Sequence, residues 1–483
     1  MINWLRDIRA YAVIIPVCAG VFIAADDQTS IVVVLPELLP DFRIGPGELN
    51  RASWTVTGYL IGYTAAMPIM GRVSDRFGHR VVFVGALVIF MLGSALVAIS
   101  PDLPGLIGED EPDLKWMIGA RVFQAIGGGA MIPVAIASVA DVLPRARHAM
   151  AFGIIGASAE AGSVIGPLWA GLITNVSSWE WVFWINIPLG IGVIAALKFS
   201  PAGVRNPVRI DLVGGALFVA VLALLTATLS RAGDTDVVFG ILIAATGAAV
   251  IATVWWHRKV ADPILPVRLL RTIEFTASNA AHLAAGISLI TVMVTVPLMA
   301  NTVLGLSPLD GGLMLLRMTV AIPFGAIAGG LLVQKVGARW PAIAGFVLVA
   351  LGLAAMSQWD IDIGEPLMTI HLAISGFGFG LLIAPIHISA LHHAKAGERG
   401  TASALITASR MVGMTIGLAA VTAWGTVRFE NLAADAPISL EGVEQITSAG
   451  LTVFRGFFVS ASVVAVLGVI PVWLMSRDQV KNA

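Results

Sequence analysis

The sequence predicts an all-α integral membrane protein of about fourteen transmembrane helices. Hydrophobic residues make up 57% of the 483 residues and charged residues only 12%, whereas soluble domains have roughly 45–50% apolar and about 25% charged residues. Apolar runs of about 20 residues, enough to cross a bilayer as a helix, recur along the whole chain. Runs such as 81–98 lack the alternation of a transmembrane β-strand. Spanning helices are therefore the expected elements.

The fourteen expected spans are apolar stretches separated by shorter polar or charged segments. They cover residues 10–38, 52–71, 80–99, 114–138, 148–173, 181–199, 211–230, 237–256, 275–300, 309–333, 341–358, 367–391, 400–427 and 451–475. An even number of spans places both termini on the same side of the membrane. With both termini in the cytoplasm, the cytoplasmic loops collect most of the lysine and arginine residues, as the positive-inside rule requires. We expect a multi-pass protein of the bacterial inner membrane.

An internal repeat suggests that the chain is built from two related halves. The segments 71–80 and 330–339 have the same residue type at three positions and a basic residue at a fourth. The matched pairs are Gly71 and Gly330, Arg76 and Lys335, Gly78 and Gly337, and Arg80 and Arg339. Parallel repeats of this kind are a known plan for transporters, with the substrate site between the halves. The expected domains are a six-helix bundle at 1–200, two extra helices and a connector at 201–272, and a second bundle at 273–483.

Several motifs carry a resemblance to the major facilitator superfamily. Residues 71–80 resemble its cytoplasmic loop signature, and 121–130 resemble its helix-four motif. Residues 162–171 are similar to the helix-five motif of its exporters. Residues 27–36 and 181–188 resemble the first and sixth helices of its fourteen-helix drug:proton antiporters. The resemblance covers nearly the whole chain and implies the major facilitator fold: two six-helix bundles plus two extra helices.

A narrower resemblance, to actinobacterial triacylglyceride exporters that are also described as drug efflux transporters, lies in residues 54–68, Glu160, 410–420 and 423–429. It implies a lipid substrate, proton coupling and a periplasmic lipoprotein partner. Arg317 departs from the general drug exporters, which often have proline there. The residues themselves leave open whether the substrate is a neutral lipid or a cationic amphipathic drug.

Six charged residues fall well inside the expected spans. They are Asp26, Asp27, Arg121, Glu160, Arg317 and Arg410. An ionisable group at this depth costs at least about 2.5–3.5 kcal/mol, so each is a functional candidate. Three acids and three bases also suggest internal pairing. The alternative is that each acid only neutralises a base and holds two helices together.

Proton coupling is the role expected for the acids. A carboxylate whose arginine partner moves between two states can load and release a proton. Glu160 is the first candidate, Asp27 the second and Asp26 the third, although the resemblance favours Asp27 within that pair. Arg410 is expected to act as the electrostatic partner of an acid on the opposite side of the cavity. Three further polar residues join this set: Arg317 as an electrostatic gate, and Arg121 and Gln124 at the polar positions of the helix-four motif.

A gate is the role expected for the segment 71–80. Gly71 and Gly78 allow a tight turn between two helices. Three charged residues of the same segment, Asp75, Arg76 and Arg80, are expected to form ion pairs, with Asp141 as a partner, that close the cytoplasmic side. The alternative is a loop whose positive charge only sets the topology.

Two further segments carry expectations. The antiporter motif contains Gly162, Gly166, Pro167 and Gly171, of which the first three are expected to let their helix bend and pack closely against a neighbour. The outer loop 429–451 either prolongs the helices on both sides and offers a docking surface to a periplasmic acceptor, or is a solvated connector.

Other classes of function find little support in the sequence. It has no phosphate-binding Gly-x-x-x-x-Gly-Lys-Ser/Thr loop, so an ion gradient is the expected energy source. It has no His-Glu-x-x-His and no Gly-x-Ser-x-Gly element, and its one cysteine is Cys18. We therefore expect no enzyme, no cofactor, no metal site and no nucleic-acid partner. A membrane sensor that does not transport is the remote alternative.

Overall fold

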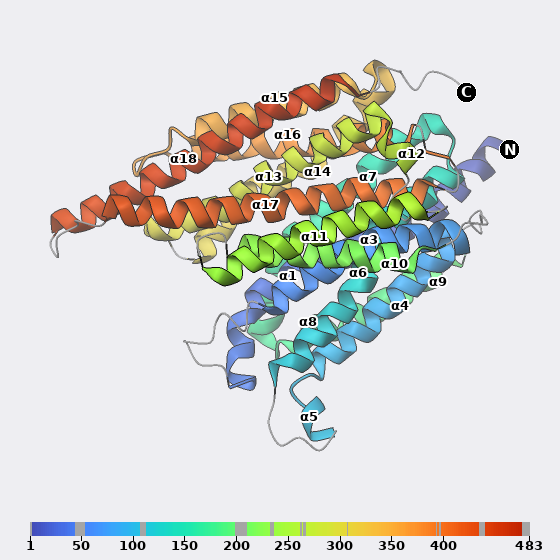
Figure 1. Cartoon of the computed structure of the whole chain (residues 1–483), viewed down its shortest axis with the longest axis horizontal. Helices are drawn as coiled ribbons and strands as arrows, with labels where there is room; N and C mark the ends of the chain where they lie inside the picture. The colour runs from blue at the N-terminus through green and yellow to red at the C-terminus, as the bar shows by residue number, and fades with distance from the viewer. Residues whose placement is uncertain are drawn as a thin grey trace. The chain divides into compact units, whose positions relative to one another are not determined.

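In its described residues the computed structural model consists almost entirely of α-helices (Figure 1). It describes residues 2–43, 54–106, 113–198, 210–231, 236–260, 263, 267–306, 308–392, 394–395, 398–433 and 440–475. Within these ranges no β-strand is present. The prediction of an all-α protein is therefore confirmed.

The described elements are long helices interrupted by three short ones. They are α1 (Ile2–Asp41), α3 (Trp54–Phe77), α4 (His79–Ala98), α5 (Leu103–Leu106), α6 (Leu114–Val142), α7 (Arg145–Val176), α8 (Glu180–Trp184), α9 (Asn186–Leu197), α10 (Leu212–Ser230), α11 (Val237–Lys259), α12 (Val267–Leu270), α13 (Ile273–Thr302), α14 (Pro308–Val336), α15 (Arg339–Met356), α16 (Glu365–Leu391), α17 (Arg399–Ala433) and α18 (Leu440–Trp473).

Twelve helical segments in the described residues are long and apolar enough to cross a membrane, with α8 and α9 together forming one of them. Each of the fourteen predicted spans has a helix in the structure. The two that fall outside the twelve are α3 and α17, which are long enough but less apolar. The end of α3 carries Arg72, Asp75 and Arg76, which explains its lower hydropathy. A multi-pass membrane protein is thus supported, while the count of fourteen spans stays a prediction.

The chain forms two compact units. The first contains residues 1–219, 256–267 and 394–408, and the second contains 220–255, 268–393 and 409–483. In the first unit α1 packs against α7, and α6 packs against both α3 and α4. In the second unit α16 packs against α14 and α15, and α18 packs against α13 and α15. The boundaries 200 and 272 proposed from the sequence stay predictions.

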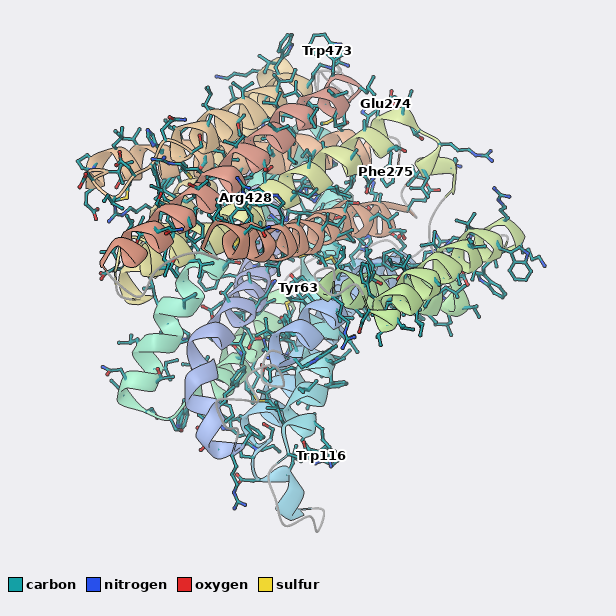
Figure 2. All side chains as sticks on the ribbon, turned by 60° about the vertical axis from the view of Figure 1, so that its left-hand side comes forward. Tyr63, Trp116, Glu274, Phe275, Arg428 and Trp473 are labelled. Atoms are coloured by element: carbon teal, nitrogen blue, oxygen red, sulfur yellow. The ribbon has the colours of Figure 1, made fainter. Side chains whose placement is uncertain are left out.

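The two repeated segments have the same backbone conformation. Gly78 has φ 94° and Gly337 has φ 78°, a left-handed region that side chains with a Cβ rarely adopt. In both copies the glycine N–H donates to the carbonyl four residues earlier, and the next helix begins one or two residues later. The second copy is anchored by Arg339, which donates to the Met475 carbonyl at 2.6 Å and lies over the ring of Trp473. Figure 2 labels Trp473.

The helices flanking the loop 429–451 are longer than the predicted spans. Helix α17 continues to Ala433, and α18 begins at Leu440. The expectation that this loop prolongs its two helices is confirmed for these residues. The turn itself, 434–439, lies outside the described residues.

Candidate functional site

A fully buried ion pair lies inside the first unit. Asp27 on α1 and Arg121 on α6 are 1% and 0% exposed, and Arg121 Nη1 donates to Asp27 Oδ2 at 2.7 Å. Both residues were predicted from the sequence. Removing one partner of such a pair costs about 3–5 kcal/mol because the other charge is left uncompensated. The structure therefore holds Asp27 and Arg121 together as one electrostatic element.

Amide and hydroxyl groups complete the surroundings of Asp27. Gln124 and Asn186 each donate an N–H to Asp27 Oδ1 at 2.9 Å. The same two amides donate to the Ser94 hydroxyl oxygen, at 2.7 Å and 3.2 Å. Gln124 was predicted, whereas Asn186 and Ser94 were not. We call these four residues, together with Arg121, the Asp27 cluster.

Asn186 lies where the sixth predicted span changes from α8 to α9. Helix α8 ends at Trp184 and α9 begins at Asn186, with Ile185 between them in a helical conformation. Pro188 lies in the first turn of α9 and has no N–H to donate to the Trp184 carbonyl. Helix α9 contacts α1 and α4, the helices that carry Asp27 and Ser94.

Aromatic rings cover the guanidinium of Arg121. Its Cζ lies 4.1 Å from the ring centroid of Tyr59 and 5.6 Å from that of Phe183. Tyr59 stacks in turn on Tyr63, with 5.7 Å between the ring centroids. Cation–π contacts of this kind stabilise a desolvated cation. Arg121 Nε and Nη2 make no hydrogen bond within the described part of the chain.

Asp26 has different surroundings from its neighbour Asp27. It is buried, at 8% exposure, and the described residues offer it no ion-pair partner. Its polar neighbour is Ser30, whose hydroxyl donates to the backbone carbonyls of Asp26 at 2.8 Å and of Gly166 at 3.0 Å. Adjacent residues of a helix point about 100° apart. The two acids of α1 therefore have different surroundings. Asp27 forms an ion pair with Arg121, and Asp26 forms no ion pair within the described residues.

The antiporter motif packs directly on this part of α1. A Cβ added at Gly166 would lie 2.4 Å from the Asp26 carbonyl oxygen and 2.4 Å from Thr29 Oγ1. A Cβ at Gly162 would lie 2.3 Å from the Phe22 carbonyl oxygen. Only glycine permits this approach of α7 to α1. The expected close packing of the motif is therefore present, and it is made at the turn that carries Asp26. Pro167 and Gly171 are part of the same helix.

The remaining charged candidates lie in separate places. Glu160 is half-buried on α7. Arg317 forms an ion pair with Glu365 and donates to the Thr369 hydroxyl at 3.0 Å. Both partners lie in the first two turns of α16, so Arg317 is tied to the start of that helix. Arg410 is half-buried on α17, within the second unit.

A second polar site lies at the turn between α3 and α4. Asp75 is fully buried and accepts hydrogen bonds from the N–H groups of Gly400 and Thr401 and from the Thr401 hydroxyl, at 3.0–3.1 Å. These N–H groups belong to the first turn of α17, where helix donors lack internal partners and the dipole is positive. Burial raises the pKa of the Asp75 carboxyl, which His79 and these hydrogen bonds oppose.

Asp141 is the partner of two basic groups at this turn. His79 Nε2 lies 3.1 Å from Asp141 Oδ2 and 4.0 Å from Asp75 Oδ1. Arg399 Nη1 donates to Asp141 Oδ1 at 2.8 Å and to the Ala140 carbonyl at 2.7 Å. Asp75, His79, Asp141 and Arg399 form what we call the turn cluster. The sequence led us to Asp75 and Asp141 but not to His79 and Arg399, and the ion pairs expected for Arg76 and Arg80 stay predictions.

The residues that sequence reasoning missed are mostly uncharged. A search for buried charges overlooks Asn186 and Ser94, although Asn186 lies within the quoted segment 181–188. His79 lies inside the recognised segment 71–80, and a search for histidines near acids would have found it. The donors at Gly400 and Thr401 are backbone groups, which no residue type reveals.

The comparisons with known proteins agree on the fold. The sequence profile of the Major Facilitator Superfamily matches residues 17–215, 209–418 and 279–483. Among solved structures, the proton:xylose symporter XylE matches with a TM-score of 0.65 at 14% identity, covering 95% of each chain. The human organic anion transporter MFSD10 matches with a TM-score of 0.62 at 15% identity, covering 94% of this chain and 99% of that one.

Curated relatives are similar over most of their length. A protein of Mycobacteroides abscessus named triacylglyceride transporter is 35% identical over 431 residues, which is 85% of this chain and 81% of the relative. A protein of Mycolicibacterium smegmatis with the same name is 32% identical over 488 residues, 93% of this chain and 84% of the relative. A triacylglyceride transporter of Mycobacterium tuberculosis is 33% identical over 436 residues, which is 86% of this chain and 82% of the relative. These are names of transporters, in agreement with the prediction of a protein that is not an enzyme.

Proposed function

This chain belongs to the Major Facilitator Superfamily, and on that premise we propose that it is a proton-coupled secondary exporter of triacylglyceride or a related lipid. The substrate would move from the inner membrane toward the periplasm by alternating access, with both termini in the cytoplasm. The observation that carries the proposal is the pair of adjacent acids on α1, one in a buried ion pair with Arg121 and one without an ion-pair partner in the described residues.

Proton coupling is supported by the contrast between Asp26 and Asp27. An ionised carboxylate at bilayer depth carries a large cost that either a counter-charge or a proton removes. Asp27 has the counter-charge of Arg121 and two amide donors. Asp26 has none of these, so binding and releasing a proton is the change open to it. Glu160, which the sequence placed first and which lies on the helix that packs against α1, stays a candidate for the proton.

A mechanical link between protonation and movement is supported by the antiporter motif. Because Gly162 and Gly166 contact the backbone of α1 between Phe22 and Thr29, a shift of α1 on protonation would be passed to α7 directly. Interfaces packed this closely have few intermediate positions. We propose that the α1–α7 contact converts the charge change into the conformational change.

A cytoplasmic gate is the role we propose for the turn cluster. Asp75 holds the first turn of α17 through three hydrogen bonds, and Asp141 holds Arg399 of the same helix. Opening the cytoplasmic side would require these contacts to break. Arg317, Arg410, Arg76 and Arg80 stay candidates for further electrostatic contacts in the transport cycle.

A lipid substrate is supported by the names of the relatives and by the small number of charged residues inside the spans. The curated relatives named triacylglyceride transporters cover most of this chain at 32–35% identity. The prolonged helices α17 and α18 offer a surface to a periplasmic lipoprotein acceptor, which a lipid insoluble in water would need.

The second candidate function is export of cationic amphipathic drugs in exchange for protons. Buried carboxylates favour it, because an acid that binds a proton can also bind a cation. It differs from the lipid proposal in the charge of the substrate. A sensor without transport is the remaining alternative, and it predicts binding without vectorial flux.

Export from proteoliposomes distinguishes these functions. Liposomes under an imposed pH gradient would carry either a fluorescent triacylglyceride, with an acceptor lipoprotein outside, or a cationic dye, for the wild type and Glu160→Gln. We expect gradient-dependent export of the lipid. Export of the dye alone would make the protein a drug antiporter, and absence of both fluxes would support the sensor.

A further inference from the structure

An open cavity lies within the second unit. It has a volume of about 220 Å³ and is lined by α13, α17 and α18. Its walls include Ile287, Val421, Trp424, Phe457 and Val464. The rings of Trp424 and Phe457 meet edge to face, with centroids 5.4 Å apart at 66°. The two rings form one wall of the cavity.

Two glycines fix the position of these rings. A Cβ at Gly425 would lie 2.3 Å from Phe457 Cζ, and a Cβ at Gly456 would lie 2.7 Å from Trp424 Cη2. Each ring therefore lies against the backbone of the opposite helix. Without the glycines the rings would be pushed out of this position, and the cavity would lose its wall.

The lining of the cavity is neutral, and its polar groups are two hydroxyls and the indole N–H of Trp424. None of the ten residues that line it in the described chain is charged. Its two hydroxyls donate within their own helices, Thr291 to the Ile287 carbonyl at 2.9 Å and Ser460 to the Gly456 carbonyl at 2.8 Å. A phosphate or a cationic drug would require a charged partner. An uncharged hydrocarbon requires none, so the chemistry of the lining selects a hydrocarbon.

The size and the mouth of the cavity restrict the occupant further. Pockets for whole drug-sized ligands have about 300–1,000 Å³, so 220 Å³ admits only part of a large lipid. Two apolar side chains at or next to the lining are exposed: Trp424, which lines the cavity, is 47% exposed, and Val463, which precedes the lining residue Val464, is 52% exposed. Exposed apolar side chains on a spanning helix face lipid. An occupant can thus enter from the bilayer while the rest of its mass stays outside the cavity.

We propose that this cavity binds one acyl chain of the neutral acylglycerol that the protein exports. This inference rests on the proposed function and adds a binding site to it. The site lies between α13 and the outer parts of α17 and α18, the two helices that continue past their predicted spans. A chain bound here would hold the lipid beside these prolonged helices before its release.

Photo-crosslinking tests the site with a matched pair of variants. A triacylglyceride with a diazirine on one acyl chain would be reconstituted with the wild type, Val464→Phe and Val463→Phe. Val464 lines the cavity, whereas the adjacent Val463 points outward and does not. We expect label on the peptides that contain Trp424 and Phe457, and an about tenfold loss in Val464→Phe, equivalent to about 1.4 kcal/mol, with wild-type labelling in Val463→Phe.

The outcomes separate the site from the proposed function. Wild-type export without label in the cavity, or equal labelling of both variants, would overturn the inference alone. Equal labelling by a diazirine phosphatidylcholine would show that an ordinary membrane lipid occupies the cavity, and would also overturn it. Label in the cavity without any wild-type export would overturn the proposed function and, with it, the role of the cavity in export.

Discussion

The two neighbouring acids of α1 should respond differently to the same substitution. Asp27→Asn leaves the charge of Arg121 uncompensated in the interior, at a cost of about 3–5 kcal/mol. Asp26→Asn removes a carboxylate that has no ion-pair partner among the described residues. We expect a large fall of the thermal unfolding midpoint in detergent for Asp27→Asn, and near-wild-type stability with loss of proton-dependent export for Asp26→Asn. Equal stability of the two variants would contradict this assignment.

Asn186 should act through its contact with Asp27. Asn186→Ala removes one of two amide donors to Oδ1, and a hydrogen bond to a charged group contributes about 1.5–3 kcal/mol. Asn186→Asp instead places a second carboxylate 2.9 Å from the first. At equal amounts of folded protein, we expect Asn186→Ala to export less than the wild type and Asn186→Asp to export less than Asn186→Ala. An alanine variant that loses more activity than the aspartate variant would rule out this role.

Asp75 provides a prediction about pH. Burial raises the pKa of its carboxyl in the folded protein, whereas an unfolded aspartate titrates near about 3.9. The folded state therefore holds this proton to higher pH, so the stability of the wild type falls as pH rises between the two pKa values. Relative to Asp75→Asn, the unfolding midpoint of the wild type should decrease from about pH 4 upward and then level off. The exposed Asp362→Asn serves as control, and a difference that grows with pH would contradict the prediction.

The limits of sequence reasoning are clearest for single residues. Asp26, Asp27 and Arg121 could be found because charge is rare in spanning helices. The pairing of Asp141 could not, since the sequence contains several basic residues near it and only the structure selects His79 and Arg399. Asn186 was not predicted, because an uncharged amide inside a span lacks the large free-energy cost that makes a charged side chain conspicuous there.

At the level of elements, the α1–α7 contact yields a direct prediction. Gly166→Ala places a methyl group 2.4 Å from the Asp26 carbonyl oxygen, and overpacking of this kind costs about 1–3 kcal/mol. We expect a lower unfolding midpoint and reduced export. Gly119→Ala on α6 is the control, because a Cβ there meets nothing within 4 Å. The idea that α7 follows α1 fails if both variants export like the wild type.

Most helices could be predicted because apolar length is a strong signal in a membrane protein. The repeat of segments 71–80 and 330–339 also predicted two glycines in equivalent turns, and both have positive φ. The break between α8 and α9 was not predicted. A proline near the start of a helix leaves the apolar pattern of span 181–199 unchanged, so hydropathy cannot locate such a break.

For the whole molecule, the family and the fold could be predicted from motifs spread along the chain. The coupling of proton binding to lipid transport cannot be predicted from these motifs. The two units contain different sites. The Asp27 cluster and the turn cluster lie in the first unit, and Arg317, Arg410 and the neutral cavity lie in the second. Whether proton binding in the first unit drives lipid movement is a property of the transport cycle. It must be measured on the intact protein.

The most direct measurement is lipid export as a function of the proton gradient. Proteoliposomes with fluorescent triacylglyceride and an outside acceptor would be followed with the gradient imposed, absent, and collapsed by a protonophore, for the wild type and Asp26→Asn. The account predicts that the gradient accelerates export by the wild type, that the protonophore removes the acceleration, and that Asp26→Asn shows none. Lipid export by the wild type at the same rate under all three conditions would contradict it.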